Sequence, residues 1–62
     1  MIRLKKERKK RNMTQSDLAF ELRIHPSQIS KIENGMVKPF KPNRTKLEEF
    51  FNMDINTLLE DI

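Results

Sequence analysis

The chain contains no cysteine, no tryptophan and no tyrosine, and it has only one glycine among its 62 residues. Without cysteine, neither a disulfide nor a thiolate metal site can supplement the core, and a reducing compartment is favoured. A chain this short buries only about 60% of its unfolded surface, so we expect one small domain with a marginal core. No apolar run approaches the ~18 residues of a membrane span, and no apolar segment follows the basic start as a signal peptide requires. These absences argue against a membrane protein, a secreted precursor and a disulfide scaffold.

Charge is distributed unevenly along the chain. Residues 1–12 carry seven Lys or Arg and one Glu, whereas residues 47–62 carry five Asp or Glu and no Lys or Arg. A basic pole on a small domain favours a polyanionic partner, nucleic acid above all, although a solvated surface has the same composition. The run KKERKKR (residues 5–11) also matches a nuclear import tract, but a helix accounts for the same residues.

Residue preferences predict a first helix over residues 1–11, followed by Asn12, which tolerates the left-handed conformation that ends helices. A second helix begins at Thr14, a favourable N-cap. Asp17, three residues later, is a near miss of the capping box, which prefers Glu or Gln. Helical spacing gives this helix an inner face of Leu18, Ala19 and Leu22. Phe20 points away from that face, either as an isolated exposed residue or as part of a partner surface.

A tight turn at residues 23–24, with Ile24 pointing inward, leads to a third helix over residues 26–34. His25 is the expected N-cap and Pro26 stands at the first helical position, where proline costs no hydrogen bond. The inner side carries Ile29 and Ile32, and the other side carries Ser27, Gln28, Ser30, Lys31 and Asn34. Amides, hydroxyls and a cation on one face match the donors and acceptors of base-pair edges. Gly35 ends the helix in a left-handed cap.

The rest of the chain predicts a loop and two more helices, and no strand. The loop spans residues 36–42 and contains two prolines and two lysines. A fourth helix is expected from an N-cap at Asn43 to Phe51, before a second Asn ending at Asn52. Its inner residues are Leu47, Phe50 and Phe51. Asp54 caps a final helix with Ile55, Leu58, Leu59 and Ile62 at helical spacing.

The segments TQSDLAFEL (residues 14–22) and ISKIENG (residues 29–35) resemble the Cro/phage-repressor type of helix-turn-helix, the lambda-repressor-like domain. The resemblance continues through the basic loop to NMDINTLL (residues 52–59) and covers about residues 2–61. It implies an all-α, compact five-helix bundle over residues 1–62, with its helix-turn-helix unit at 14–35. It also implies a sequence-specific, repressor-like regulator of transcription that binds double-stranded DNA with residues 26–34 in the major groove.

The same resemblance assigns roles to individual residues. Base contacts are implied for Pro26, Ser27, Gln28 and Lys31. Phosphate contacts are implied for Thr14, Gln15, Lys38, Lys41, Asn43 and Arg44. A structural ion pair is implied between Arg8 and Glu33.

Three positions depart from the family pattern. Arg23 stands where the family usually has Gly, so a residue with a side chain must adopt the backbone geometry of the turn. His25 replaces the usual Ser or Thr cap. Pro26 offers only an apolar contact at a position often used for polar ones, and the loop after the third helix is longer than usual.

The sequence also bears on two other classes of function. A protein-interaction module of the same fold, antitoxin-like or a co-regulator subunit, is motivated by Phe20 and the apolar stripe of the last helix. An enzyme is disfavoured because a single His and no Cys leave no set of catalytic roles in mutual reach. We expect no cofactor, no metal site and no small-molecule ligand.

The remaining expectations concern assembly and location. We expect a homodimer to form on DNA or through apolar residues of the last helix, although most of these also suit the core. The candidates are Ile55, Leu58, Leu59 and Ile62. We expect a cytoplasmic protein of prokaryotic or phage type, associated with the nucleoid through DNA.

Overall fold

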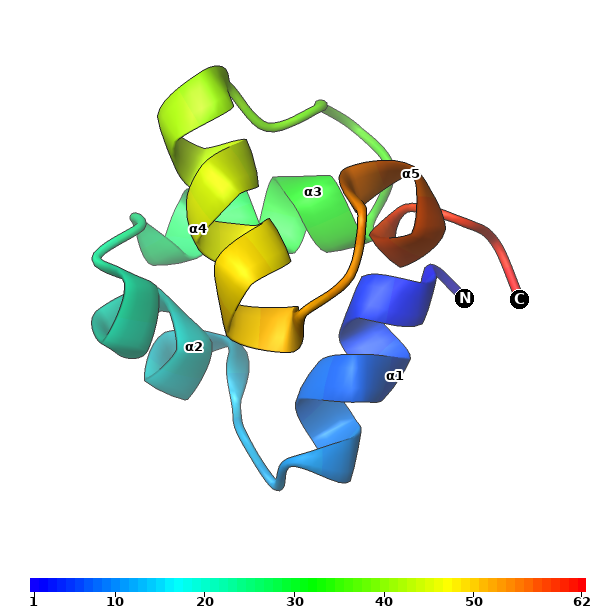
Figure 1. The fold of residues 1–62 in the computed structure, drawn as a ribbon. Coiled ribbons are helices and arrows are strands. Elements are labelled where there is room, and N and C mark those ends of the chain that lie inside the picture. The colour runs from blue at the N-terminus through cyan, green and yellow to red at the C-terminus, as the bar shows by residue number, and fades with distance from the viewer.

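Five α-helices make up the chain, and the computed structural model describes all of it, residues 1–62 (Figure 1). They are α1 (Arg3–Lys10), α2 (Gln15–Leu22), α3 (Pro26–Glu33), α4 (Lys41–Phe51) and α5 (Ile55–Leu58). The predicted all-α, five-helix bundle is confirmed. None of the five helices combines the length and the apolar content needed to cross a bilayer.

One apolar core receives side chains from every helix. Its buried members are Leu4, Leu18, Ala19, Ile24, Ile29, Ile32, Leu47, Phe51 and Leu58. Burying a Leu, Ile or Phe side chain stabilises a fold by roughly 1.5–3 kcal/mol, so this core is the main favourable term. Ile29 and Ile32, the predicted inner residues of α3, are both 0% exposed. Their burial fixes which side of α3 faces outward.

Left-handed residues end the first four helical segments, because the chain must reverse direction there. Asn12, Arg23 and Asn52 have φ of 57°, 56° and 54°, and Gly35 has φ of 73°. Asn tolerates this region better than most residues and Gly adopts it without penalty. After α3, the amides of Gly35 and Met36 donate to the carbonyls of Ile32 and Lys31 at 3.1 and 2.9 Å, which is a Schellman ending.

The two ends of the chain lie side by side next to α1 and α5 (Figure 1). The amino group of Met1 contacts the Asp61 carboxylate at 2.7 Å, and the Arg3 amide donates to the Glu60 carbonyl at 2.8 Å. Ile2 forms an isolated antiparallel bridge with Asp61. This pairing keeps Ile2 extended, so α1 begins at Arg3 and the prediction of a helix from residue 1 is wrong by two residues.

The capping box of α2 is complete, so its description as a near miss is wrong. Thr14 Oγ1 accepts from the Asp17 amide at 3.0 Å, and Asp17 Oδ2 accepts from the Thr14 amide at 2.9 Å. The shorter Asp side chain reaches the cap amide in this geometry. The two reciprocal bonds satisfy two amides that would otherwise be left open at the start of the helix.

The start of α4 differs from the prediction. Its N-cap is Phe40, and Asn43, the predicted cap, lies inside the first turn. The Arg44 amide donates to the Phe40 carbonyl at 2.7 Å, which closes that turn. Pro42 fits there because the amides of the first turn have no partner within the helix.

The last helix is shorter than predicted, and Leu58 is excluded from any dimer surface. α5 is a single turn capped by Asp54, whose Oδ2 accepts from the Asn56 amide at 2.9 Å. Leu58 is 0% exposed and belongs to the core. Ile55 and Leu59 are half-buried, whereas Ile62 lies beyond the helix and is 47% exposed.

Candidate nucleic-acid interface

α3 has an inner apolar side and an outer polar side. Of its outer residues, Pro26, Ser27 and Lys31 are exposed, and Gln28 is half-buried at the margin. The structure therefore places the four predicted base-contacting residues on the surface of one helix, within its first two turns. A helix presented in this way fits the width of the DNA major groove.

The start of α3 is fixed by local bonds. His25 is the N-cap, and its Nδ1 accepts from the Ser27 amide at 3.1 Å. Pro26 follows at the first helical position, where its missing N–H leaves nothing unpaired. The first two outward residues of α3 are thus held by their own cap.

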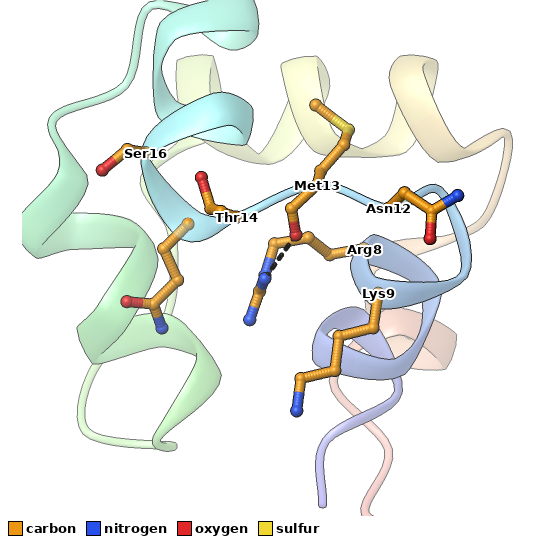
Figure 2. Close-up of a pocket in the computed structure, with 7 residues that line it drawn as sticks. Arg8, Lys9, Asn12, Met13, Thr14 and Ser16 are labelled. Atoms are coloured by element: carbon orange, nitrogen blue, oxygen red, sulfur yellow. Dashed lines mark hydrogen bonds between the residues drawn. The ribbon is translucent and has the colours of Figure 1, made fainter.

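A buried ion pair ties α3 to α1. Arg8 Nε contacts Glu33 Oε2 at 2.7 Å and Arg8 Nη2 contacts Glu33 Oε1 at 3.0 Å, a bidentate geometry. Arg8 Nη1 also donates to the Met13 carbonyl at 2.6 Å, a bond drawn in Figure 2. The Arg8 and Glu33 side chains are 7% and 0% exposed, so the Arg8 charge is paired in the interior of the fold.

Gln15 joins this network from the first position of α2. Its Nε2 donates to Glu33 Oε1 at 3.0 Å. An amide nitrogen carries two N–H groups, so one remains for a second acceptor. The bond to Glu33 holds the Gln15 side chain in place and leaves its other N–H without a partner in the chain.

A shallow hollow lies where α1 ends and α2 begins (Figure 2). It is lined by Arg8, Lys9, Asn12, Met13, Thr14, Gln15 and Ser16. The backbone amides of Gln15 and Ser16, at the first two helical positions, have no hydrogen-bond partner in the chain. Free amides at a helix N-terminus attract anions, and the Lys9 ammonium adds a full positive charge. Lys9 is not among the phosphate contacts predicted from the sequence, although the basic run over residues 1–12 indicated cations in this region.

The remaining predicted phosphate contacts fall on two elements. Lys38, in the loop, and Arg44, on α4, are both exposed and line one cavity of about 240 Å³ with Asn56. Lys41 is exposed and Asn43 is half-buried, both in the first turn of α4, and neither lines that cavity. The structure therefore places Lys38 and Arg44 at one cavity, with Lys41 outside its lining.

Part of the N-terminal positive charge is structural. The buried carboxylate of Glu7 accepts from Arg11 Nη1 at 3.1 Å and lies 3.6 Å from Lys10 Nζ. The hydrogen bond from Arg11 holds the pKa of Glu7 below its ordinary value, with Lys10 contributing. Arg11 also lies over the Phe51 ring, 4.8 Å from its centroid. Arg11 thus binds α1 to α4, as Arg8 binds α1 to α3, whereas the contact of Lys10 stays within α1.

No three His, Asp or Glu side chains come close enough together to hold a metal ion. The candidate site consists of the polar face of α3, flanked by cations and by the free amides of α2.

A family model described as helix-turn-helix matches residues 4–58. The chain belongs to the helix-turn-helix family of Cro/phage-repressor-like domains. Membership of this family indicates a DNA-binding regulator, and the family is generally not enzymatic. None of the curated proteins and none of the solved structures compared with the chain gives a significant match.

Proposed function

We propose that this helix-turn-helix protein binds a specific site in double-stranded DNA and regulates transcription as a repressor-like protein. Residues 14–35 form its helix-turn-helix unit, within a single domain over residues 1–62. The observation that carries the proposal is the division of α3: Ile29 and Ile32 are fully buried, while Ser27 and Lys31 are exposed on the other side. We place its action in the cytoplasm, on the nucleoid.

In this proposal α3 lies in the major groove and reads bases with its outer residues. The Gln28 amide pairs with adenine N6 and N7, and the Lys31 ammonium contacts guanine O6 and N7. Ser27 adds a single hydrogen bond, and Pro26 contacts an apolar base edge such as a thymine methyl group. Each good bidentate contact discriminates against a wrong base by about 1–3 kcal/mol.

Phosphate contacts on both sides of α3 supply most of the affinity. The N-terminus of α2 takes one phosphate through Thr14, Gln15 and the free amides, with Lys9 beside it. The loop and α4 take others through Lys38, Lys41, Asn43 and Arg44. The logarithm of the binding constant then falls by about 0.9 per neutralised phosphate for each unit of log salt concentration.

A homodimer would place two α3 helices in successive major grooves, about 34–36 Å apart. Because Leu58 belongs to the core, the available apolar residues are Ile55, Leu59 and Ile62. We propose that the dimer uses these or forms on DNA. Sedimentation of the free protein across micromolar concentrations separates the two cases.

Two lysine variants test the assignment of roles. Lys31→Ala should relax the preference for one base pair, whereas Lys38→Ala should weaken binding to every duplex alike and reduce the salt slope by about one. Lys6→Ala, which removes an exposed cation that has no assigned contact, controls for the loss of net charge. Equal losses on every duplex for both Lys31→Ala and Lys38→Ala would contradict the roles.

A second candidate function, a protein-interaction module of the same fold, is favoured by Phe20, which is 88% exposed on α2. An aromatic side chain in water is a common anchor in protein interfaces. Retention of a protein partner that Phe20→Ser releases, without any salt-sensitive DNA binding, would support this function in place of the first.

A further inference from the structure

The start of α3 contains a hydrogen-bond arrangement between His25 and Ser27 that the base-reading scheme leaves unused. His25 Nδ1 lies 3.1 Å from the Ser27 amide nitrogen and 2.8 Å from Ser27 Oγ. Both residues are exposed, and Ser27 is the first hydroxyl on the outer side of α3. One ring nitrogen therefore meets two groups of the same residue.

The protons in this arrangement follow from the chemistry of the backbone amide. A backbone N–H only donates, so Nδ1 must be the bare, accepting nitrogen and the ring proton lies on Nε2. A bare Nδ1 at 2.8 Å from a hydroxyl oxygen is favourable only if the hydroxyl also donates, because two lone pairs would otherwise face each other. The Ser27 proton is therefore committed to His25, and lone pairs of Oγ are left for an outside donor.

We propose that His25 fixes the Ser27 hydroxyl as a hydrogen-bond acceptor toward DNA and so sets which base group Ser27 reads. The inference rests on the proposed function, in which Ser27 lies in the major groove. A free serine hydroxyl pairs with donors and acceptors alike. Held by His25, it selects the amino group of adenine N6 or cytosine N4 over the keto oxygen of thymine O4 or guanine O6. His25 is a positioning residue here, acting through Ser27.

The proton positions are measurable in the free protein, without DNA. Nitrogen-15 NMR of the His25 ring, at a pH where the ring is neutral, should show an unprotonated Nδ1 and a protonated Nε2. In a Ser27→Ala variant Nδ1 should remain unprotonated, because the backbone amide is still there. A proton on Nδ1 in the wild-type neutral ring would overturn the proposal whatever the protein binds.

The effect on base recognition is measured on a bound site, which is obtained by selection from random duplex DNA. Within that site, the base pair to test is the one whose preference Ser27→Ala changes. Deleting only the amino group of that pair with a base analogue should weaken the wild type about two- to tenfold, the range of one net hydrogen bond. Deleting only the keto oxygen should leave Ser27's contribution unchanged. If deletion of the keto oxygen abolished the affinity that Ser27 contributes, the proposal would be overturned.

Substitution of His25 then separates positioning from capping. His25→Gly removes the acceptor but keeps most of the capping preference, and His25→Asn keeps both an acceptor and the cap. Inverting the base pair, which exchanges its amino and keto groups, should reduce the DNA affinity of the wild type and of His25→Asn by similar factors. In His25→Gly, where the Ser27 hydroxyl is free to donate, the factor by which inversion reduces affinity should be about two- to tenfold smaller.

If inversion reduced the affinity of His25→Gly as much as that of the wild type, the proposal would be overturned, although the protein would still bind DNA. Failure to select any site would contradict the proposed function and this inference together. Circular dichroism of both variants confirms that α3 is folded in the samples compared.

Discussion

Arg8 and Glu33 lie 25 residues apart and form a bidentate pair with N–O distances of 2.7 and 3.0 Å in the interior of the fold. The pair joins α1 to the last turn of α3, and Gln15 Nε2 donates to the same carboxylate. One buried carboxylate thus sets the position of three helices relative to one another. Because α3 and the start of α2 carry most of the proposed DNA contacts, the pair fixes the spacing between base and phosphate contacts.

Removing one partner of this pair should be severe. Arg8→Met leaves the Glu33 charge buried and uncompensated, a change that costs about 3–5 kcal/mol in comparable pairs. A domain of this size has a total stability of roughly 3–9 kcal/mol, so most of it would be lost. Urea denaturation followed by circular dichroism measures the change. The double variant Arg8→Met/Glu33→Leu should recover much of the loss, and a double variant less stable than Arg8→Met would contradict the explanation.

Arg23→Gly should stabilise the protein. Arg23 has φ of 56° and ψ of 44°, a left-handed conformation that costs a residue with a Cβ about 1–2 kcal/mol. Glycine avoids this cost, and a gain near 1 kcal/mol raises the melting temperature of a domain of this size by about 4–8 °C. Glu21→Gly, within α2, serves as the matched control and should destabilise by about 1 kcal/mol. A lower melting temperature for Arg23→Gly would show that the Arg23 side chain makes a larger contribution than its conformation costs.

Thr14→Ala should affect both folding and binding. It removes the oxygen that accepts from the Asp17 amide, and loss of such a cap costs about 1 kcal/mol. If the start of α2 holds a phosphate, the same variant should also weaken binding to every duplex without changing base preference. Thr14→Ser, which keeps the hydroxyl, should restore both properties. Denaturation and duplex titration at constant salt check the two effects separately.

Acid should destabilise the fold through three carboxylates whose pKa values are lowered. The causes are hydrogen bonds from the Arg11 side chain to Glu7, from the Thr14 amide to Asp17, and from the Met1 amino group to Asp61. Each carboxylate holds its proton less tightly in the folded chain, so its contribution is complete above the ordinary pKa, 4.5 for Glu and 3.8 for Asp. The contribution disappears as the pH falls through the lowered values.

The urea midpoint should therefore stay level above about pH 5 and decline below it. Asp17→Asn removes one of the three groups and should flatten the decline. A midpoint that remains level down to about pH 3 would contradict the assignment.

Features that depend on local sequence were predictable. Neighbouring residues alone predict the inner faces of α2 and α3. They also predict the caps at Thr14, His25 and Asp54 and the left-handed endings at Asn12 and Asn52. The start of α4 was not, because Asn43 has the stronger capping preference and Phe40 caps without any side-chain hydrogen bond. The helix begins earlier, with Pro42 inside its first turn and the Arg44 amide bonded to the Phe40 carbonyl.

Apart from the Arg8–Glu33 pair, which the family resemblance implied, contacts between distant residues escaped prediction. The bond from Gln15 to Glu33 and the bridge between Ile2 and Asp61 join segments that only the folded chain brings together. Lys9 appeared in the sequence as one of seven similar cations. In the folded chain Lys9 lines the hollow beside the free amides of α2. Arg8 and Arg11 are instead paired with Glu33 and Glu7.

The central claim, that the outward side of α3 reads bases, is tested most directly by selecting bound duplexes from random DNA with the wild type and with Gln28→Ala. The wild type should enrich one defined sequence, and Gln28→Ala should lose the preference at one base pair of that sequence while keeping the others. Binding that enriches no sequence in the wild type, or an enriched sequence that Gln28→Ala, Lys31→Ala and Ser27→Ala all leave unaltered, would contradict the claim.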